Sequence, residues 1–507
     1  MDSTSTELAF VGTSDMLAAF RRLELSPLEV LDAQIARIEA HNGDTATGIN
    51  AFAETLFEDA RHAARHAADV YARCAADGEQ PPALLGVPVA AKEKHGIAGL
   101  SLTQGLTAKR GQVADRDHPV IERIRAAGGI IHARTTSPEF SCATVTHSPM
   151  WGITRNPWNL QTSPGGSSGG AGAALAAGFT TLATASDIAG STRIPAGFTG
   201  TVGYKAPFGR IPGEPPLSAD WYRGDGPMGR SVADAALLSS VMSGRHPVDH
   251  NSWGGNGQPI PLDGGVDGLR IGLSLRLGDF PVAPEVLENT RAVADALSRA
   301  GAEVVEVDLP WTTELIRETI FAHFGQILAP AVIRETAGTE DQLSAYMRRF
   351  IADSTAAAQR RSLVESLAMD ARMQADLAAA MSGVDVLLCP TSAVTSLRAD
   401  GDYLDGIDTP SGHLEHYWEG HMTSPFNVAN HHPALSVPSG LSLEGVPTGV
   451  QVVGHPRDEV MTFRVAQAVE TLVDFAAPRN SIPGRDRPAD RSQECYSAGG
   501  RVTSAGQ

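Results

Sequence analysis

Residues 156–203 read NPWNLQTSPGGSSGGAGAALAAGFTTLATASDIAGSTRIPAGFTGTVG, and this stretch decides how the rest of the chain is interpreted. It opens with a Gly/Ser loop over 164–170 that runs directly into a small-residue helix predicted over 171–178. Helices of alanine and glycine bury little apolar area but allow very close backbone approach. A second small-residue turn, 187–195, carries Ser191 at its tip, after an apolar strand predicted over 180–184. The pattern therefore predicts two serine-bearing loops that meet over one buried pocket.

A short apolar strand with a lysine at its end lies upstream. Residues 85–93 read LGVPVAAKE, so Lys92 closes the apolar run. An ammonium group on a buried strand is desolvated, which lowers its pKa and lets the neutral amine accept a proton. A serine hydroxyl attacks an amide only when such a base lies within hydrogen-bond reach. Lys92 is therefore the candidate base, and Lys94 would lower its pKa further if its charge lies nearby.

Taken together, these segments closely resemble the amidase signature family of serine hydrolases. Ser167 follows Lys92 by 75 positions and Ser191 follows Ser167 by 24, which matches the layout of that family, and similar blocks extend from about residue 13 to residue 470. The resemblance implies an α/β protein with the amidase signature fold. That fold has a central mixed, twisted sheet flanked by helices on both faces, together with a helical insertion.

The resemblance also implies a Ser-cisSer-Lys triad. Ser191 would be the nucleophile, Ser167 would bridge it to Lys92, and the Gly166–Ser167 peptide would be cis. Backbone N–H groups must lie close to the negative charge that develops on the attacked carbonyl oxygen. The resemblance assigns this oxyanion hole to four successive residues: Ile188, Ala189, Gly190 and Ser191.

Several neighbours of the triad carry predictions of their own. Glu93 and Ala189 depart from the family pattern, which usually has aspartate and glycine there, and Ala189 tests how much positive φ the turn needs. Asp187 and Arg193 flank the nucleophile and are predicted to hold the turn as a buried pair. Ser168 is predicted to satisfy loop backbone groups rather than to take part in the chemistry.

The domain organisation follows from the order of strand and helix patterns. Residues 1–479 are predicted to form a single domain, with its core at about 80–235 and 381–470 and a helical insertion at about 311–380. A capping box predicts a helix that begins after Ser26, and a second helix is predicted over 52–76. Residues 480–507 are polar, lack periodicity and are predicted to be a disordered tail.

Composition excludes several classes of protein. The formal net charge is −18, from 40 basic and 58 acidic residues, and no basic cluster is present, so a nucleic-acid partner is not expected. The four cysteines are far apart and have no CxxC grouping, which argues against a zinc site or a disulfide framework. No signal-peptide pattern and no apolar run of about 18 residues occurs. The expectation is a cytoplasmic monomer or homodimer with no membrane partner.

Three further patterns suggest ligands but carry weak predictions. The GGSSGGAG segment could cradle phosphate, yet it lacks the Gly-Lys-Ser/Thr ending of a P-loop. His62 and His66 have metal-ligand spacing but lie on an Arg/Ala-rich helical face, where plain surface histidines are expected. A histidine cluster at 413–421 lies in an irregular segment. No metal and no cofactor is therefore predicted.

The predicted activity is that of an amidase, which hydrolyses carbon–nitrogen bonds through an acyl-enzyme on serine. Bulky apolar or aryl amides are the expected substrates, with carbamates (urethanes) and esters as further candidates. Five side chains from the Pro/Gly-rich loop 209–227 and from the insertion are predicted to contact substrate: Arg210, Trp221, Tyr222, Phe321 and Phe324. The competing interpretation is that Arg210 and Arg223 bind a substrate carboxylate.

One alternative function shares the whole signature core. The glutamine-hydrolysing A subunit of a tRNA-dependent amidotransferase commonly has glutamine directly after the arginine of the nucleophile turn. Ile194 occupies that position here. The isoleucine favours a hydrolase that acts without partner subunits.

Overall fold

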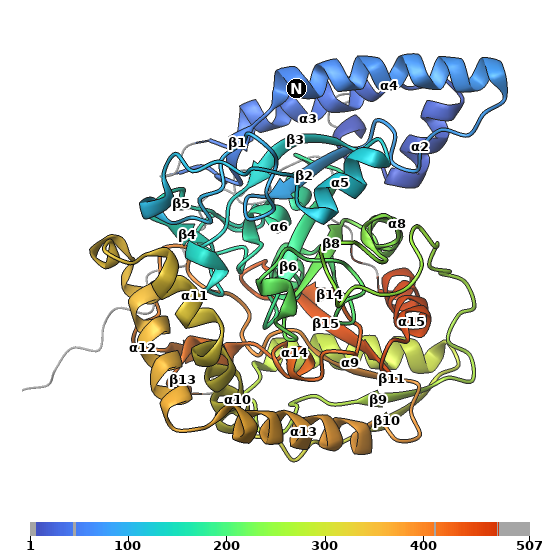
Figure 1. Cartoon of the computed structure of the whole chain (residues 1–507). Helices are drawn as coiled ribbons and strands as arrows, with labels where there is room; N and C mark the ends of the chain where they lie inside the picture. Colours follow the sequence, from blue (N-terminus) through green and yellow to red (C-terminus); the bar gives the residue numbers. More distant parts are fainter. Residues whose placement is uncertain (1–6, 44–46, 410–411, 474, 476–507) are drawn as a thin grey trace, which may run out of the picture.

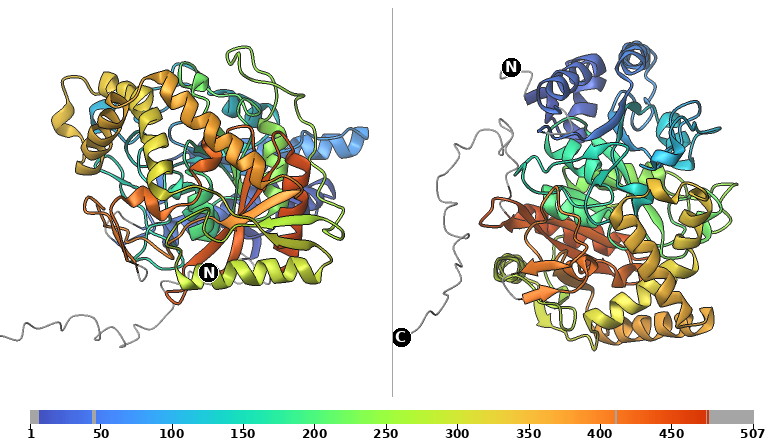
Figure 2. Two further views of the ribbon diagram at one scale, coloured as in Figure 1. Left: turned by 90° about the horizontal axis from the view of Figure 1, so that it is seen from below. Right: turned by 90° about the vertical axis from the view of Figure 1, so that its left-hand side faces the viewer.

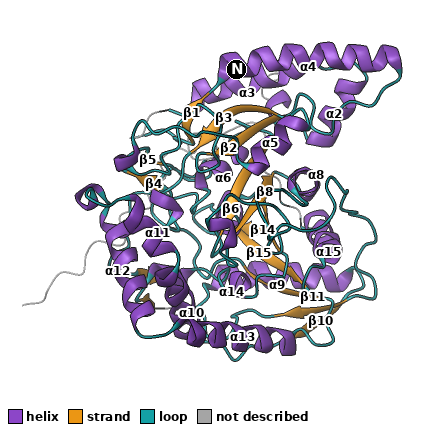
Figure 3. Cartoon of the chain, viewed as in Figure 1, coloured by secondary structure: helices purple, strands orange, loops and turns teal. Residues whose placement is uncertain are grey.

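The computed structural model describes residues 7–43, 47–409, 412–473 and 475. Strands run through the middle of the molecule and helices surround them (Figure 3). These residues contain an 11-stranded sheet. In spatial order its strands are β1 (Phe52–Thr55), β3 (Ile130–Thr135), β2 (Pro88–Lys92), β6 (Leu182–Asp187), β8 (Gly224–Gly229), β7 (Val202–Lys205), β14 (Ala434–Leu441), β15 (Pro447–Gly454), β11 (Val386–Pro390), β9 (Arg270–Leu273) and β10 (Glu303–Glu306).

The sheet is mixed, as predicted. Strand β2 runs parallel to β3 and β6, whereas β8 is antiparallel to both β6 and β7. Strands from both ends of the described chain share this sheet, which supports the prediction of one domain. Two short hairpins lie outside it: β4 (His147–Ser148) with β5 (Gly152–Ile153), and β12 (Ile407–Thr409) with β13 (Gly412–Leu414).

Helices cover both faces of the sheet. They are α2 (Thr13–Arg21), α3 (Pro27–His41), α4 (Phe57–Asp77), α5 (Pro119–Ala126), α6 (Gly169–Ala176), α7 (Arg193–Thr199), α8 (Val232–Met242), α9 (Pro284–Arg299), α14 (Pro425–Val428) and α15 (Glu459–Leu472). Side chains of a strand point alternately to its two faces. Accordingly, Ala90 of β2 packs in one cluster with the alanines of α6, and Val89 and Ala91 pack in another with residues of α5, α8 and α15.

The predicted insertion consists of four helices: α10 (Thr313–Gln326), α11 (Leu328–Glu335), α12 (Ala345–Gln359) and α13 (Leu363–Ala380). Figures 1 and 2 agree that this insertion, coloured gold, lies at the opposite end of the molecule from the blue N-terminal helices. Across the described ranges, no helix combines the length and the apolar character that a bilayer crossing requires. The predicted tail at 480–507 lies outside the described residues.

Local boundaries test the sequence predictions. The capping box at Ser26 is present and α3 begins at Pro27, so that prediction is confirmed. The helix predicted over 52–76 is wrong at its start, because Phe52–Thr55 forms an edge strand in which Phe52 pairs with Thr135. The helix begins only at Phe57. Tertiary pairing with β3 overrides the helical pattern of the segment.

Candidate active site

The side chain of Lys92 ends in a cluster of hydroxyl groups. It lies at the end of β2 and is fully buried. Its Nζ is within hydrogen-bonding distance of three hydroxyl oxygens: Ser167 at 2.7 Å, Ser168 at 2.9 Å and Ser186 at 3.1 Å. Burial lowers the pKa of Lys92 well below its usual value, and the positive charge of Lys94 lowers it further. A neutral amine can donate two hydrogen bonds and accept one, so this environment suits an uncharged lysine.

The two serine-bearing loops meet at one small pocket. Ser167 and Ser191 both line it. The Gly166–Ser167 peptide is cis, and the Ser168 N–H donates to the Ser191 carbonyl at 3.1 Å, which ties the loops together. Ser168 also accepts a hydrogen bond from the Ser186 N–H at 3.3 Å, as the prediction of a backbone role implied, but its contact with Lys92 was not predicted.

A buried ion pair holds the turn that carries Ser191. Arg193 donates to Asp187 from Nη2 at 2.9 Å and from Nε at 3.0 Å. Burial by itself would raise the pKa of Asp187, but the charge and hydrogen bonds of Arg193 lower it to about 2. The same carboxylate accepts the N–H groups of Gly190 at 2.7 Å and Thr192 at 3.2 Å. The predicted buried pair is confirmed, and it fixes the backbone on both sides of Ser191.

These hydrogen bonds change the predicted oxyanion hole. The Gly190 N–H is already donated to Asp187, so the candidates that are left are the N–H groups of Ile188, Ala189 and Ser191. Positive φ occurs at Gly190, where φ is 122°, and not at Ala189. A Cβ at Gly190 would lie 1.9 Å from Oγ1 of Thr423. Glycine is therefore required at 190, and the alanine at 189 fits without strain.

Glu93, the other departure from the family pattern, shapes the loop that follows β2. Its carboxylate accepts the N–H groups of Thr103 at 2.6 Å and Gln104 at 2.8 Å, and the hydroxyl of Thr103 at 3.0 Å. The side chain is completely buried. Glutamate at this position therefore anchors the segment around Thr103 to the end of the catalytic strand.

A second buried polar cluster, formed by Lys94, His95, His118 and Asp225, was missed by the sequence analysis. Asp225 accepts from Lys94 Nζ at 3.2 Å and pairs with His95 Nε2 at 2.9 Å and His118 Nε2 at 3.5 Å. Burial would raise the pKa of Asp225, but the charge of Lys94 and the hydrogen bond from His95 hold it well below its usual value. Burial also lowers the pKa of both histidines, which keeps them neutral.

The donor set of this cluster resembles a metal site but does not suit one. Ligand atoms of His95, His118 and Asp225 lie within 4.8 Å of one another. However, the Val120 N–H donates to His118 Nδ1, so the proton of the neutral ring is on Nε2, which faces Asp225. The cation that balances Asp225 is Lys94. The residues come from the end of β2, the start of α5 and β8, so only the tertiary fold brings them together.

The side chains predicted to contact substrate have other partners. Trp221 and Tyr222 both donate to the carboxylate of Asp370 on α13, which fastens the loop 209–227 to the insertion. Phe321 and Phe324 pack with each other inside the hydrophobic core. In this conformation none of the four lines the pocket of Ser191; its apolar wall comes from Phe140, Ile188 and Leu328.

Arg210 is also placed away from that pocket. Its Nε lies 2.6 Å from a carboxylate oxygen of Glu459 on α15, and its Nη1 donates to the Gly255 carbonyl at 3.1 Å. The guanidinium is thus engaged in holding α15. Arg223, the other arginine of the loop, does line the pocket.

This chain is similar to known proteins along most of its length. A family model described as Amidase matches residues 29–463. The chain belongs to the amidase family. Among solved structures, a bacterial aryl acylamidase of the amidase signature enzymes is similar, with a TM-score of 0.84 and 26% identity over 94% of this chain and 99% of that chain.

Two curated relatives are similar at the level of sequence. This amidase is 32% identical to the A subunit of the glutamyl-tRNA(Gln) amidotransferase of Synechococcus sp. (strain WH7803) over 499 residues, which cover 91% of this chain and 97% of the relative. It is also 32% identical to the 6-aminohexanoate-cyclic-dimer hydrolase of Paenarthrobacter ureafaciens, in an alignment that covers 92% of this chain and 96% of the relative. The predicted family and fold are therefore confirmed.

Proposed function

We propose that this amidase cleaves carbon–nitrogen bonds through an acyl-enzyme on Ser191. The observation that carries the proposal is the fully buried Lys92 amine, whose hydrogen-bond partners are the hydroxyls of Ser167, Ser168 and Ser186. Lys92 takes a proton from Ser167 as Ser167 takes one from Ser191, so the Ser191 oxygen attacks the carbonyl without leaving a buried charge unbalanced.

The remaining steps return the same proton. The N–H groups of Ile188, Ala189 and Ser191 donate to the carbonyl oxygen while it carries negative charge. The proton then passes from Lys92 through Ser167 to the leaving nitrogen as the carbon–nitrogen bond breaks. Water adds to the acyl-enzyme by the same relay, which releases the acid and restores the Ser191 hydroxyl.

The pocket wall supports substrates with an apolar group next to the carbonyl. Phe140, Ile188 and Leu328 surround the serines, and burial of apolar surface contributes about 25 cal/mol per Å². Aryl amides are the leading candidates, in line with the similar aryl acylamidase. Carbamates (urethanes) and esters present a comparable carbonyl to Ser191 and are proposed as further substrates.

Replacement of the nucleophile tests the mechanism. Ser191→Ala is expected to lower kcat/KM for an anilide by about a thousandfold or more, because no acyl-enzyme can form. A slow aryl carbamate should add its carbamoyl mass to the wild type and to Ser141→Ala, a serine on the same pocket wall, but not to Ser191→Ala. A covalent adduct in Ser191→Ala would assign the nucleophile elsewhere.

A second function is supported by the relatives that are amidotransferase A subunits. The feature that favours a hydrolase acting alone is the buried Ile194 after Arg193. Glutamine hydrolysis at rates comparable to those of the best anilide would reverse this preference.

We also propose that the protein is a cytoplasmic monomer or homodimer. Size-exclusion chromatography with light scattering tests the oligomeric state.

A further inference from the structure

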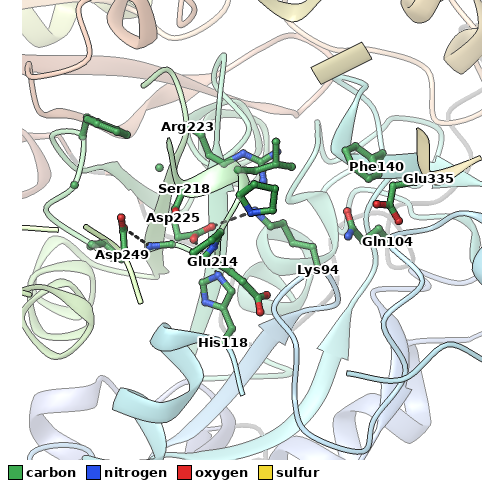
Figure 4. A pocket seen from close by; sticks show the side chains of 18 of the residues that line it. Lys94, Gln104, His118, Phe140, Glu214, Ser218, Arg223, Asp225, Asp249 and Glu335 are labelled. Carbon is green, nitrogen blue, oxygen red and sulfur yellow. Dashed lines mark hydrogen bonds and ion pairs between the residues drawn. The ribbon is translucent and has the colours of Figure 1, made fainter. Parts of the chain in front are cut away.

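Arg223 lies between two neighbouring cavities. One is the pocket of Ser167 and Ser191. The other has a volume of about 150 Å³ and is lined by polar and charged side chains that include Lys94, His118 and Asp225 (Figure 4). Arg223 and Phe140 line both cavities. A substrate that extends from Ser191 into the larger cavity therefore passes the guanidinium group.

The other cations of the larger cavity already have carboxylate partners. Lys94 pairs with Asp225 at 3.2 Å, and Lys109 and Arg334 each pair with Glu335 at 3.1 Å. The acidic residue Glu214 pairs outward with Arg116 at 3.0 Å. Apart from Arg223, the lining holds three cationic side chains, Lys94, Lys109 and Arg334, and four carboxylates, Glu214, Asp225, Asp249 and Glu335. Without Arg223 the lining therefore offers no net attraction for an anion.

Arg223 differs from its neighbours in having no such partner. Within the described part of the chain it forms no ion pair, and its Nε is buried without a hydrogen-bond acceptor. A buried donor without an acceptor destabilises the structure. The planar guanidinium group of arginine matches the geometry of a carboxylate and can bind it through two parallel hydrogen bonds. The group that would satisfy Arg223 is thus an anionic oxygen pair.

We propose that Arg223 determines specificity by binding a carboxylate of the substrate. The proposal rests on the proposed amidase function and narrows it. The preferred substrate is an amide whose apolar or aryl body lies against Phe140 and whose carboxylate reaches Arg223. The carboxylate can belong to the acyl side or to the amine side of the scissile bond, and the two placements are distinguishable by experiment.

Three anilides separate these cases. They are neutral para-nitroacetanilide, succinyl para-nitroanilide with its carboxylate on the acyl side, and 5-acetamido-2-nitrobenzoate, which carries its carboxylate on the nitroaniline that leaves. The wild type is expected to prefer one of the charged anilides over the neutral one by about tenfold to a hundredfold in kcat/KM, which is typical of a buried charge-assisted contact. The anilide that shows the preference identifies the side.

Variants of Arg223 assign the preference to the residue. Arg223→Met should bring the ratio of charged to neutral kcat/KM close to one, and Arg223→Lys should keep part of the preference because the charge is kept. Arg334→Met removes an equal charge from the rim of the same cavity, where Glu335 already pairs with it, and should keep the wild-type ratio. Rates are compared at a pH where activity has reached its plateau, because the charge of Arg223 also lowers the pKa of Lys92.

Binding without turnover keeps this test separate from the proposed function. Dissociation constants of the three anilides are measured by calorimetry with Ser191→Ala and with the Ser191→Ala/Arg223→Met double variant. Loss of the charged-ligand preference in the double variant supports the proposal. A wild-type ratio at or below one for both charged anilides, or an equal ratio in Arg223→Met, overturns it. Failure to hydrolyse any of the three would count against the amidase mechanism, while the calorimetry would still decide the role of Arg223.

Discussion

Lys92 and Lys94 stand two residues apart, and their partners differ in charge. Lys92 is fully buried, and the Lys94 side chain is 10% exposed. Lys92 contacts three hydroxyls, whereas Lys94 contacts the carboxylate of Asp225 at 3.2 Å. Burial lowers the pKa of both, but Asp225 partly offsets this for Lys94, whose pKa is about 8. The partner therefore decides the charge: hydroxyls leave Lys92 neutral, and the carboxylate keeps Lys94 protonated at neutral pH.

The comparison also explains how one site can hold a neutral base among charges. The ionised groups, Asp187 with Arg193 and Lys94 with Asp225, are paired with each other. They hold the nucleophile turn and the end of β2 in place. The proposed proton relay uses side chains that carry no charge at rest, namely Lys92, Ser167 and Ser191.

The largest expected effect comes from removal of the neutral lysine. Lys92→Ala should lower kcat/KM by about a hundredfold to ten-thousandfold, the range for loss of a general base. Wild-type activity should rise from mildly acidic to higher pH as Lys92 loses its proton, and the residual activity of the variant should lack this limb. Stopped assays of both proteins from acidic to alkaline pH measure the loss of kcat/KM and show whether the limb is present.

Lys205 is the matched control for that experiment. It is also buried, burial lowers its pKa to about 7, and its contacts are backbone carbonyls at 3.4 Å and 3.5 Å. Lys205→Ala should keep the pH limb of the wild type. An unchanged limb in Lys92→Ala would show that another group, such as a histidine, is the base.

The next effect concerns stability at the charged cluster. Asp225→Asn removes the carboxylate that pairs with Lys94, and breaking a buried pair costs about 3 kcal/mol, the lower end of its usual range because Lys94 can lose its proton. Since the folded pKa of Asp225 lies well below the usual 3.8, its contribution is present above pH 3.8 and is lost as the pH falls through the folded pKa. The variant and the wild type should therefore converge in acid.

Denaturant unfolding at neutral and acidic pH measures this difference. Asp249→Asn is the control, because Asp249 lines the same cavity but accepts from the backbone N–H groups of Gly213 and Asn251. The free energy of unfolding should fall less in Asp249→Asn, because that substitution breaks no ion pair. An equal decrease in the free energy of unfolding for both variants would show that the pairing with Lys94 does not stabilise the fold.

Much of the fold could be predicted because its signals are local. The Ser26 capping box marked a helix and the apolar run before Lys92 marked a strand, and the structure confirms both. The edge strand at Phe52 could not be predicted, since it depends on pairing with β3, and the segment that follows it is a strong helix former. When tertiary pairing sets the boundary between a strand and a helix, the sequence near that boundary carries no local pattern that marks it.

The same distinction applies to the site. Lys92, Ser167 and Ser191 stand in local motifs, and the structure brings Lys92 to Ser167 and both serines to one pocket. Partners of Arg210 and Tyr222 come from α15 and α13, far away in sequence, so their engagement with Glu459 and Asp370 could not be predicted. The use of the Gly190 N–H by Asp187 likewise depends on the folded turn.

The smallest expected effect sharpens the comparison of the two lysines most directly. The positive charge of Lys94 is the second cause, after burial, of the lowered pKa of Lys92. Lys94→Met removes that charge and leaves Asp225 to favour a protonated Lys92, so the activity limb should move to higher pH. On the limb this lowers kcat/KM by about twofold to tenfold, while the plateau at high pH is reached by both proteins. Arg116→Met removes an exposed charge that pairs with Glu214 and should leave the limb in place. If Lys94→Met lowers activity equally at every pH, Lys94 acts by holding the structure of the strand end, and its charge does not tune the base.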